Sequence, residues 1–166
     1  YNLNKEDFSW SNVASFDMMK PYTDDGDVEK NRGWIHQDGK HSMVGVLYLS
    51  TNEDVGTCFY NKKDNYEIPQ EYIDYKEEYY LDQNNIEKSD NYFESKKIHN
   101  SNFIETAKVK SVYNRLICYD AKLYHAYDDM SKITDDRLTF NFFFNEIGVD
   151  KTPLERVYRY DKRKRN

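Results

Sequence analysis

The chain has 166 residues, enough for one domain, and its 30 acidic against 24 basic side chains give it a net charge of −6. A negative net charge does not favour nucleic acid or anionic lipid, and no apolar run approaches the ~20 residues that a membrane helix needs. Sixteen tyrosines, nine phenylalanines and two tryptophans can build a core despite the low mean hydropathy, so we expect a single folded domain over residues 1–166.

The two cysteines, Cys58 and Cys118, both lie in apolar, strand-like runs. Two buried thiols in a reducing compartment fit this placement better than a disulfide does. The chain starts at Tyr1 without an initiator methionine, which leaves open whether residues precede it, and no signal peptide is visible. We therefore expect a soluble protein in the cytoplasm.

The expected elements are mostly strands. Residues 8–19 form a first element that is either a short strand or a helix. Runs rich in β-branched and aromatic residues, bounded by turn formers, then predict strands. These strands cover residues 34–38, 43–50, 56–60, 103–112, 115–119, 123–127, 137–145 and 152–160. Short strands with one helical insertion indicate an all-β fold with minor α, closed as a sandwich, barrel or jelly roll.

The insertion covers residues 61–102, which are rich in charged residues and tyrosine. Pro69 begins a run that predicts a helix ending near Leu81. Residues 82–102 resemble a long surface excursion, as in lids and mobile segments, with a solvated His99. The helix is expected to pack on the sheet rather than form an aromatic substrate platform. The side chains expected to make this contact are Tyr72, Ile73, Tyr79 and Tyr80.

A candidate metal site starts from His36 and Asp38, two residues apart in one expected strand. Residues i and i+2 of a strand point to the same face, so this spacing aims an imidazole and a carboxylate at one point. Two histidines and one carboxylate form the facial triad of non-haem iron oxygenases. His125, in a distant strand, is the candidate for the second histidine, and His41 is expected to be a loop or rim residue. Taken singly, a strand histidine is more often structural than a ligand.

A second candidate site lies on the strand that begins at Arg137. Arg137, Thr139, Asn141 and Phe143 share one face of this strand. A buried arginine is costly without an anion, and a ligand carboxylate would pair with it in bidentate fashion beside the Thr139 hydroxyl. An internal Asp or Glu would satisfy the arginine equally well, and spacing does not choose between the two.

Four segments carry a resemblance to a known family: residues 45–50, 56–60, 114–126 and 137–144. They resemble Fe(II)- and 2-oxoglutarate-dependent oxygenases of the prolyl-hydroxylase-like kind, particularly small members from bacteria and their viruses. The resemblance extends over roughly residues 34–144, with the insertion aligning poorly. It implies a double-stranded β-helix, a jelly roll whose mouth holds the metal, in agreement with the strands above.

The resemblance also implies residue roles. Fe(II) would be bound by His36, Asp38 and His125, with no catalytic residue beyond these ligands. Arg137 would pair with the distal carboxylate of 2-oxoglutarate, with Thr139 and Tyr48 beside it. Prolyl hydroxylases that act on collagen have lysine where Arg137 stands, which puts a collagen-like substrate in doubt.

The activity that this family implies is that of a hydroxylating dioxygenase. It would use O2 to couple decarboxylation of 2-oxoglutarate to oxidation of a second substrate, with release of succinate and CO2. The substrate stays open among a peptide, an amino acid, a nucleobase and another small molecule. Two alternatives also stay open: a non-catalytic jelly-roll module in a larger protein assembly, and a cupin-like metalloenzyme that does not use 2-oxoglutarate.

Overall fold

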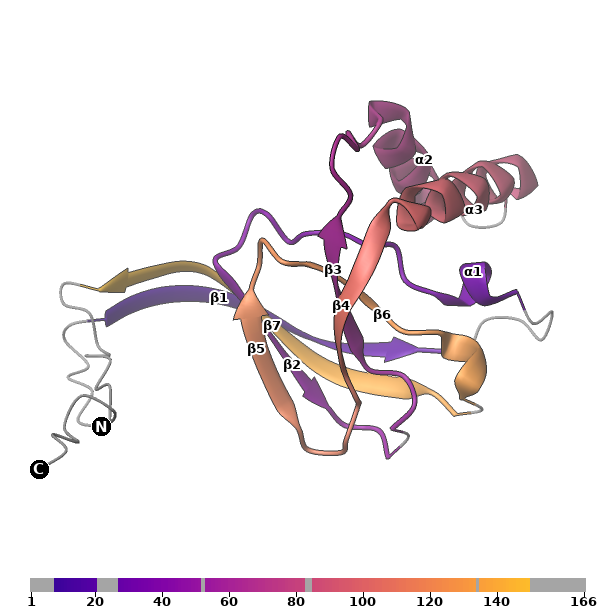
Figure 1. The fold of residues 1–166 in the computed structure, drawn as a ribbon. Coiled ribbons are helices and arrows are strands. Elements are labelled where there is room, and N and C mark those ends of the chain that lie inside the picture. The colour runs from indigo at the N-terminus through magenta and orange to yellow at the C-terminus, as the bar shows by residue number, and fades with distance from the viewer. Residues whose placement is uncertain (1–7, 21–26, 52, 83–84, 134, 150–166) are drawn as a thin grey trace, which may run out of the picture.

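The computed structural model describes residues 8–20, 27–51, 53–82, 85–133 and 135–149, and within them two antiparallel sheets dominate (Figure 1). One sheet has the order β1-β7-β2-β5 and the other β4-β3-β6. The strands are β1 (Phe8–Met19), β2 (Met43–Tyr48), β3 (Thr57–Lys62), β4 (Phe103–Val109), β5 (Leu116–Asp120), β6 (Tyr124–Tyr127) and β7 (Arg137–Val149). The helices are α1 (Val28–Asn31), α2 (Gln70–Leu81), α3 (Ile86–Ser101) and the 3-10 turn η2 (Met130–Lys132). The expected all-β class with minor α is confirmed.

The core between the sheets follows the alternation of β2. Val44, Val46 and Tyr48 are buried on one face of this strand, where Tyr119 and Phe143 pack against them. Burying each such side chain contributes roughly 1.5–3 kcal/mol. The alternation predicted for residues 43–50 is therefore confirmed, and it determines which face of the sheet lines the interior.

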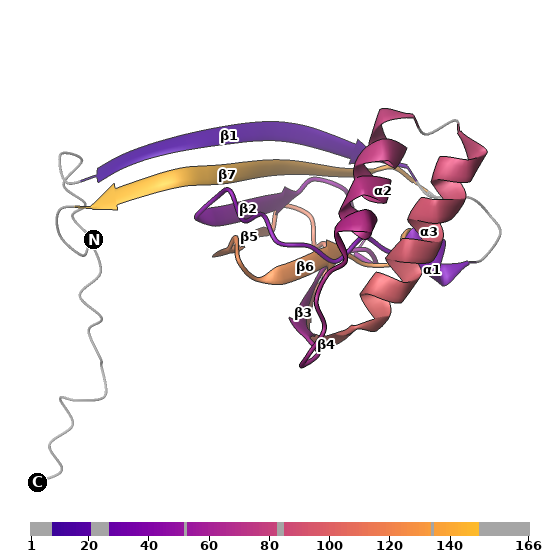
Figure 2. The same cartoon turned by 90° about the horizontal axis from the view of Figure 1, so that it is seen from above.

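Strands β1 and β7 form a long antiparallel pair, from Phe8 opposite Val149 to Met19 opposite Arg137 (Figure 2). The element that the sequence left undecided between strand and helix is thus a strand of 12 residues. Its own pattern is irregular, and pairing with the strongly aromatic β7 decides its conformation. The register places Asp17 opposite Thr139, which brings an acidic side chain to the interior face of the sheet.

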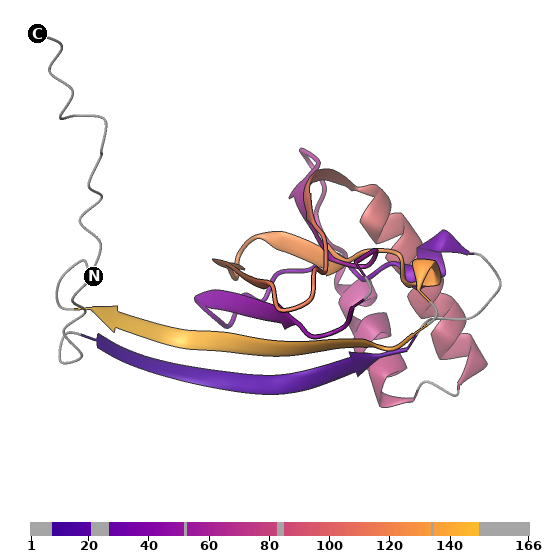
Figure 3. The same cartoon turned by 90° about the horizontal axis from the view of Figure 1, so that it is seen from below.

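Helices α2 and α3 pack together at the end of the molecule away from the first residues of β1 (Figure 3). The helix predicted from Pro69 to Leu81 is confirmed as α2. The prediction of an irregular excursion over residues 82–102 is wrong, because α3 occupies most of it. The prediction missed this helix because the buried face of α3 is largely polar and shows no apolar periodicity. This face consists of Tyr92, Ser95, Lys96 and His99.

The expectation that His99 is solvated is also wrong, because its side chain is fully buried. The expected contact of α2 with the sheet is also corrected. Tyr79 is buried against Trp34 and Tyr92, whereas Ile73 and Tyr80 are 39% and 55% exposed. The α2–α3 pair therefore packs on the segment around Trp34 through an aromatic cluster.

Two smaller expectations are corrected, and a third lies beyond the part of the chain that the structure describes. The strand expected at residues 34–38 is reduced to one bridge between His36 and His125. Cys58 is buried but Cys118 is exposed, which corrects the expectation of two buried thiols, and neither is in a disulfide. The strand expected at 152–160 lies outside the described residues. None of the helices in the described ranges is long and apolar enough to cross a membrane.

Candidate metal centre and adjoining cavity

The first two candidate ligands lie on an extended segment that runs beside β6. The His36 amide donates to the His125 carbonyl at 3.0 Å, and the His125 amide donates to the His36 carbonyl at 2.9 Å. The Asp38 amide then donates to the Ala121 carbonyl at 2.9 Å. These bonds place the two histidines opposite each other, with Asp38 two residues further along the same segment.

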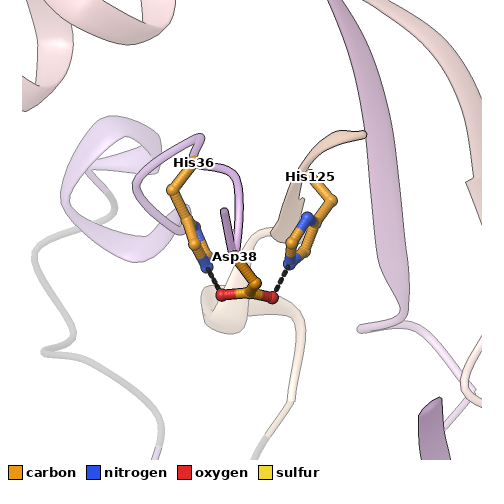
Figure 4. A group of neighbouring side chains, drawn as sticks. All are labelled: His36, Asp38 and His125. Carbon is orange, nitrogen blue, oxygen red and sulfur yellow. Dashed lines mark ion pairs between the residues drawn. The ribbon is translucent and has the colours of Figure 1, made fainter. Parts of the chain in front are cut away.

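The three side chains converge on one point (Figure 4). Nε2 of His125 lies 3.2 Å from one Asp38 oxygen, and Nε2 of His36 lies 3.6 Å from the other. The ligand atoms of all three residues lie within 4.8 Å of one another. Ligands about 2.1 Å from a shared octahedral metal would be roughly 3 Å apart, so the spacing fits a metal after small adjustments.

The backbone fixes the tautomers of both histidines. His36 Nδ1 lies 2.7 Å from the Trp34 carbonyl, and His125 Nδ1 lies 2.9 Å from the Leu123 carbonyl. Since a carbonyl oxygen only accepts, each Nδ1 must donate, so Nε2 is the nitrogen that each ring presents to Asp38. Metal-binding histidines are typically oriented by such a bond. Both Nε2 atoms therefore face a carboxylate, an arrangement that either a proton on an imidazole or a bound metal ion stabilises.

The electrostatics disfavour a proton on His36. Burial, aided by the charges of His125 and Lys76, lowers the pKa of His36 to about 4. Burial opposes ionisation of Asp38, but its hydrogen bond with His125 and the charge of His36 outweigh this and lower the pKa of the carboxyl. Near neutral pH the group thus presents a neutral His36 and an ionised Asp38, the protonation states that a metal requires.

A cavity of about 220 Å³ adjoins these residues. Its wall contains His36, Asp38 and His125, and also Arg137 and Thr139 from β7. The face of β7 that the sequence assigned to Arg137, Thr139, Asn141 and Phe143 thus borders the same space as the candidate metal ligands. No described residue between 61 and 102 lines this cavity.

Arg137 is buried without a carboxylate at ion-pair distance among the described residues. Its Nε donates to the Val55 carbonyl at 3.1 Å, and its guanidinium lies 5.6 Å from the centre of the Tyr48 ring. Burial lowers the pKa of Arg137, but an arginine keeps its charge in a protein. The hydroxyl of Thr139 is also buried and has no hydrogen-bond partner in the described part of the chain. Both groups would gain from an anionic ligand.

The place beside the cosubstrate that the resemblance implies for Tyr48 stays a prediction. The Tyr48 side chain is 1% exposed, and its hydroxyl lies 2.7 Å from Oγ1 of Thr57. Thr57 lines the cavity, whereas Tyr48 is not among the described lining residues. Tyr48 thus supports the wall from behind, and Thr57 is the hydroxyl that faces the cavity.

Asp17 is a lining residue that the sequence reasoning missed. One of its oxygens accepts a hydrogen bond from Nδ2 of Asn141 and the other from the Ser15 hydroxyl at 3.1 Å. Recognising residues 8–19 as a strand paired with β7 would have revealed it. Asp17 is the internal carboxylate nearest in register to Arg137, yet its hydrogen bonds go elsewhere.

The two remaining histidines lie outside the three-residue group. His41 lies 2.5 Å from the Asn145 side chain in a loop, as expected for a rim residue. His99 is in α3 and contacts the backbone of Ile35. Both differ from the candidate ligands, whose Nε2 atoms face a carboxylate.

Residues 28–144 match a family model described as a family of unknown function, DUF6445. The match covers more than half of the chain, so the protein belongs to this family. The matched range includes the three candidate ligands and the cavity residues of β7 up to Phe144. No curated protein matches the chain.

Proposed function

We propose that this member of a family of unknown function is an Fe(II)- and 2-oxoglutarate-dependent dioxygenase that hydroxylates a second substrate. The observation that carries the proposal is the convergence of two histidine Nε2 atoms and one carboxylate on a single point. When both rings are neutral, three electron-pair donors in this arrangement repel one another unless a metal ion joins them. Two histidines and a carboxylate are the donor set of non-haem iron oxygenases.

The cavity supports 2-oxoglutarate as the cosubstrate. Among the described residues, Arg137 supplies a guanidinium without a carboxylate partner, and Thr139 supplies a hydroxyl without a hydrogen-bond partner. Together they suit the distal carboxylate of a 2-oxo dicarboxylic acid, whose other end would lie toward His36, Asp38 and His125. Iron bound there would supply the activation of dioxygen.

The chain's own residues have three tasks in this proposal. His36 and His125 offer Nε2 atoms whose direction is fixed by backbone carbonyls. Asp38 offers a charged oxygen held between them. The apolar wall formed by Val44, Val46 and other core residues limits water around the reacting atoms.

The strand connections support a double-stranded β-helix. After β1 in the first sheet, the chain passes to the His36 bridge beside β6 in the second and returns to the first with β2. It then runs through β3 and β4 in the second sheet, β5 in the first, β6 in the second and β7 in the first. Alternation between two sheets is expected for the winding of a jelly roll and supports this part of the proposal.

The test is an anaerobic titration of the metal-free protein with Fe(II), followed by 2-oxoglutarate. Chelation of protein-bound ferrous ion by 2-oxoglutarate gives a weak visible metal-to-ligand charge-transfer band. We expect the band to saturate at one equivalent of each and to be lost in His125→Ala. His41→Ala is the matched control, because it removes a histidine outside the group, and it should titrate like the wild type.

Two results would contradict the proposal. If Fe(II) does not bind, the three residues are not a metal site, and a non-catalytic jelly-roll module becomes the better assignment. If Fe(II) binds but 2-oxoglutarate gives no band, a cupin-like metalloenzyme is favoured. The cupin-like alternative has one observation on its side: Asp17 places a negative charge in the cavity that must accept the cosubstrate.

A further inference from the structure

The segment that leads to His36 lies between β6 and helix α3. In a regular sheet, a second strand would stand in the place of this helix. Toward β6, the segment makes the backbone bonds of the His36 bridge, and the Gly33 amide donates to the Tyr127 carbonyl at 3.2 Å. On the other side there is no described strand. Instead, side chains of α3 bond directly to the backbone of residues 30–35.

Three side chains of α3 make five hydrogen bonds to this backbone. Nζ of Lys96 donates to the carbonyls of Lys30 and Arg32, at 3.0 and 2.9 Å. Asn100 donates to the Gly33 carbonyl at 3.0 Å and accepts from the Ile35 amide at 3.1 Å. Finally, His99 Nε2 lies 2.7 Å from the Ile35 carbonyl.

His99 is oriented by a second contact. Its Nδ1 lies 2.9 Å from the Tyr66 hydroxyl, and its ring stacks on Trp34 with centroids 4.8 Å apart. The Ile35 carbonyl can only accept, so Nε2 carries the proton and Nδ1 accepts from Tyr66. Burial lowers the pKa of His99, in keeping with this neutral ring.

The helix is poorly suited to a purely structural role. Positions 96, 99 and 100 lie on one face of a helix, and Lys96 and His99 are 1% and 0% exposed. A helix that only filled the core would bury apolar side chains there, because buried polar groups are costly unless each finds a partner. Here the partners are backbone groups of the segment that ends in two candidate metal ligands.

We propose that Lys96, His99 and Asn100 are positioning residues for the metal centre, which fix the backbone from which His36 and Asp38 reach the metal. The inference rests on the proposed function. The Trp34 carbonyl that orients His36 belongs to the same segment, so a shift of residues 33–35 would turn the imidazole away from its partners. The described part of the insertion thus supports the ligand segment from behind and does not line the cavity.

The test uses His99→Phe, which keeps a ring against Trp34 but removes the bond to Ile35. His99→Gln is the conservative variant, since its amide can still donate to that carbonyl. Lys97→Ala, on the exposed face of the same helix, is the control. Fe(II) affinity is measured anaerobically by competition with a chelator, and amide hydrogen exchange of residues 33–36 is measured without metal.

We expect His99→Phe to bind Fe(II) about 10- to 100-fold more weakly, the loss typical of residues that orient metal ligands. Faster exchange at Ile35 and His36 should accompany this loss. His99→Gln should recover most of both properties, and Lys97→Ala should match the wild type. If His99→Phe does not fold, Asn100→Leu removes the neighbouring bonds and carries the same test.

The inference is overturned if the folded His99→Phe or Asn100→Leu protein binds Fe(II) as tightly as the wild type. It is also overturned if His99→Gln binds no better than His99→Phe. A wild-type protein that binds no Fe(II) contradicts the proposed function instead. The two failures are therefore distinguishable.

Discussion

The substitution Arg137→Leu tests whether Arg137 binds a ligand or only stabilises the fold. Arg137 is 7% exposed, and its described contacts are the Val55 carbonyl, the Met19 sulfur and the face of Tyr48. None of these neutralises its charge. If the anion it serves is the cosubstrate, the substitution should weaken 2-oxoglutarate binding while leaving the metal-free protein about as stable as before.

The expected magnitudes follow from these contacts. Loss of hydrogen bonds from a guanidinium to a carboxylate costs about 3 kcal/mol, which is roughly a hundred-fold in affinity. For the metal-free protein, leaving the Val55 carbonyl without Arg137 costs about 1–3 kcal/mol. Removing a buried charge that lacks a carboxylate partner offsets this by a similar amount, so the net change should stay within about 1 kcal/mol.

Two assays measure the two quantities. The anaerobic charge-transfer titration gives the affinity for 2-oxoglutarate at saturating Fe(II), and urea denaturation with a chelator gives the unfolding free energy of the metal-free protein. The reasoning is refuted by the reverse pattern. If Arg137→Leu lowers the unfolding free energy by about 3–5 kcal/mol, as breaking a buried ion pair does, and leaves the affinity unchanged, Arg137 is a structural residue.

Three further predictions concern other parts of the molecule. Asp17→Asn removes a negative charge from the cavity wall and should tighten 2-oxoglutarate binding by about 1 kcal/mol, roughly fivefold, in the same titration; weaker binding would contradict the proposed orientation of the cosubstrate. Burial lowers the pKa of Lys96 to about 8, so the unfolded chain holds this proton more tightly, and the unfolding free energy should rise from pH 8 toward 10. Lys96→Met should lose this rise in urea denaturation across that range, and an equal rise in both proteins would refute it. Gly56→Ala would place a Cβ 1.7 Å from the Val109 carbonyl oxygen and should lower the unfolding free energy by at least about 2 kcal/mol, so a neutral result would show that β3 and β4 can separate there.

The sequence predicted the elements whose pattern of apolar and polar residues does not depend on distant parts of the chain. β2 alternates apolar residues that the structure buries, and α2 begins just after Pro69 as proline chemistry predicts. The spacing of His36 and Asp38 put both side chains on one side of their segment even though a full strand did not form there. The local pattern was sufficient in each case because packing against distant residues did not change the conformation that the pattern predicts.

The elements that the sequence failed to predict depend on partners far along the chain. Helix α3 buries Lys96 and His99 because the backbone of residues 30–35 satisfies them, and no periodicity scale recognises a polar core face. Asp17 reaches the cavity only through the register of β1 on β7. The resemblance assigned Tyr48 to the cavity, but the Tyr48 hydroxyl is hydrogen-bonded to Thr57, and Thr57 is the residue that lines the cavity.

The position of the insertion bears on which residues would select a substrate in the proposed enzyme. Since no described residue between 61 and 102 borders the cavity, α2 and α3 do not form its wall. The side chains left to contact a substrate beside the candidate ligands come from the sheets, among them Asp17, Met19, Tyr119 and Phe143. In the proposed enzyme, a cavity of about 220 Å³ that would also hold a five-carbon cosubstrate has room for a small molecule or for one side chain of a larger substrate. In the proposed enzyme, a peptide substrate would therefore insert a single residue, and the aromatic and acidic side chains of β1, β5 and β7 would select it.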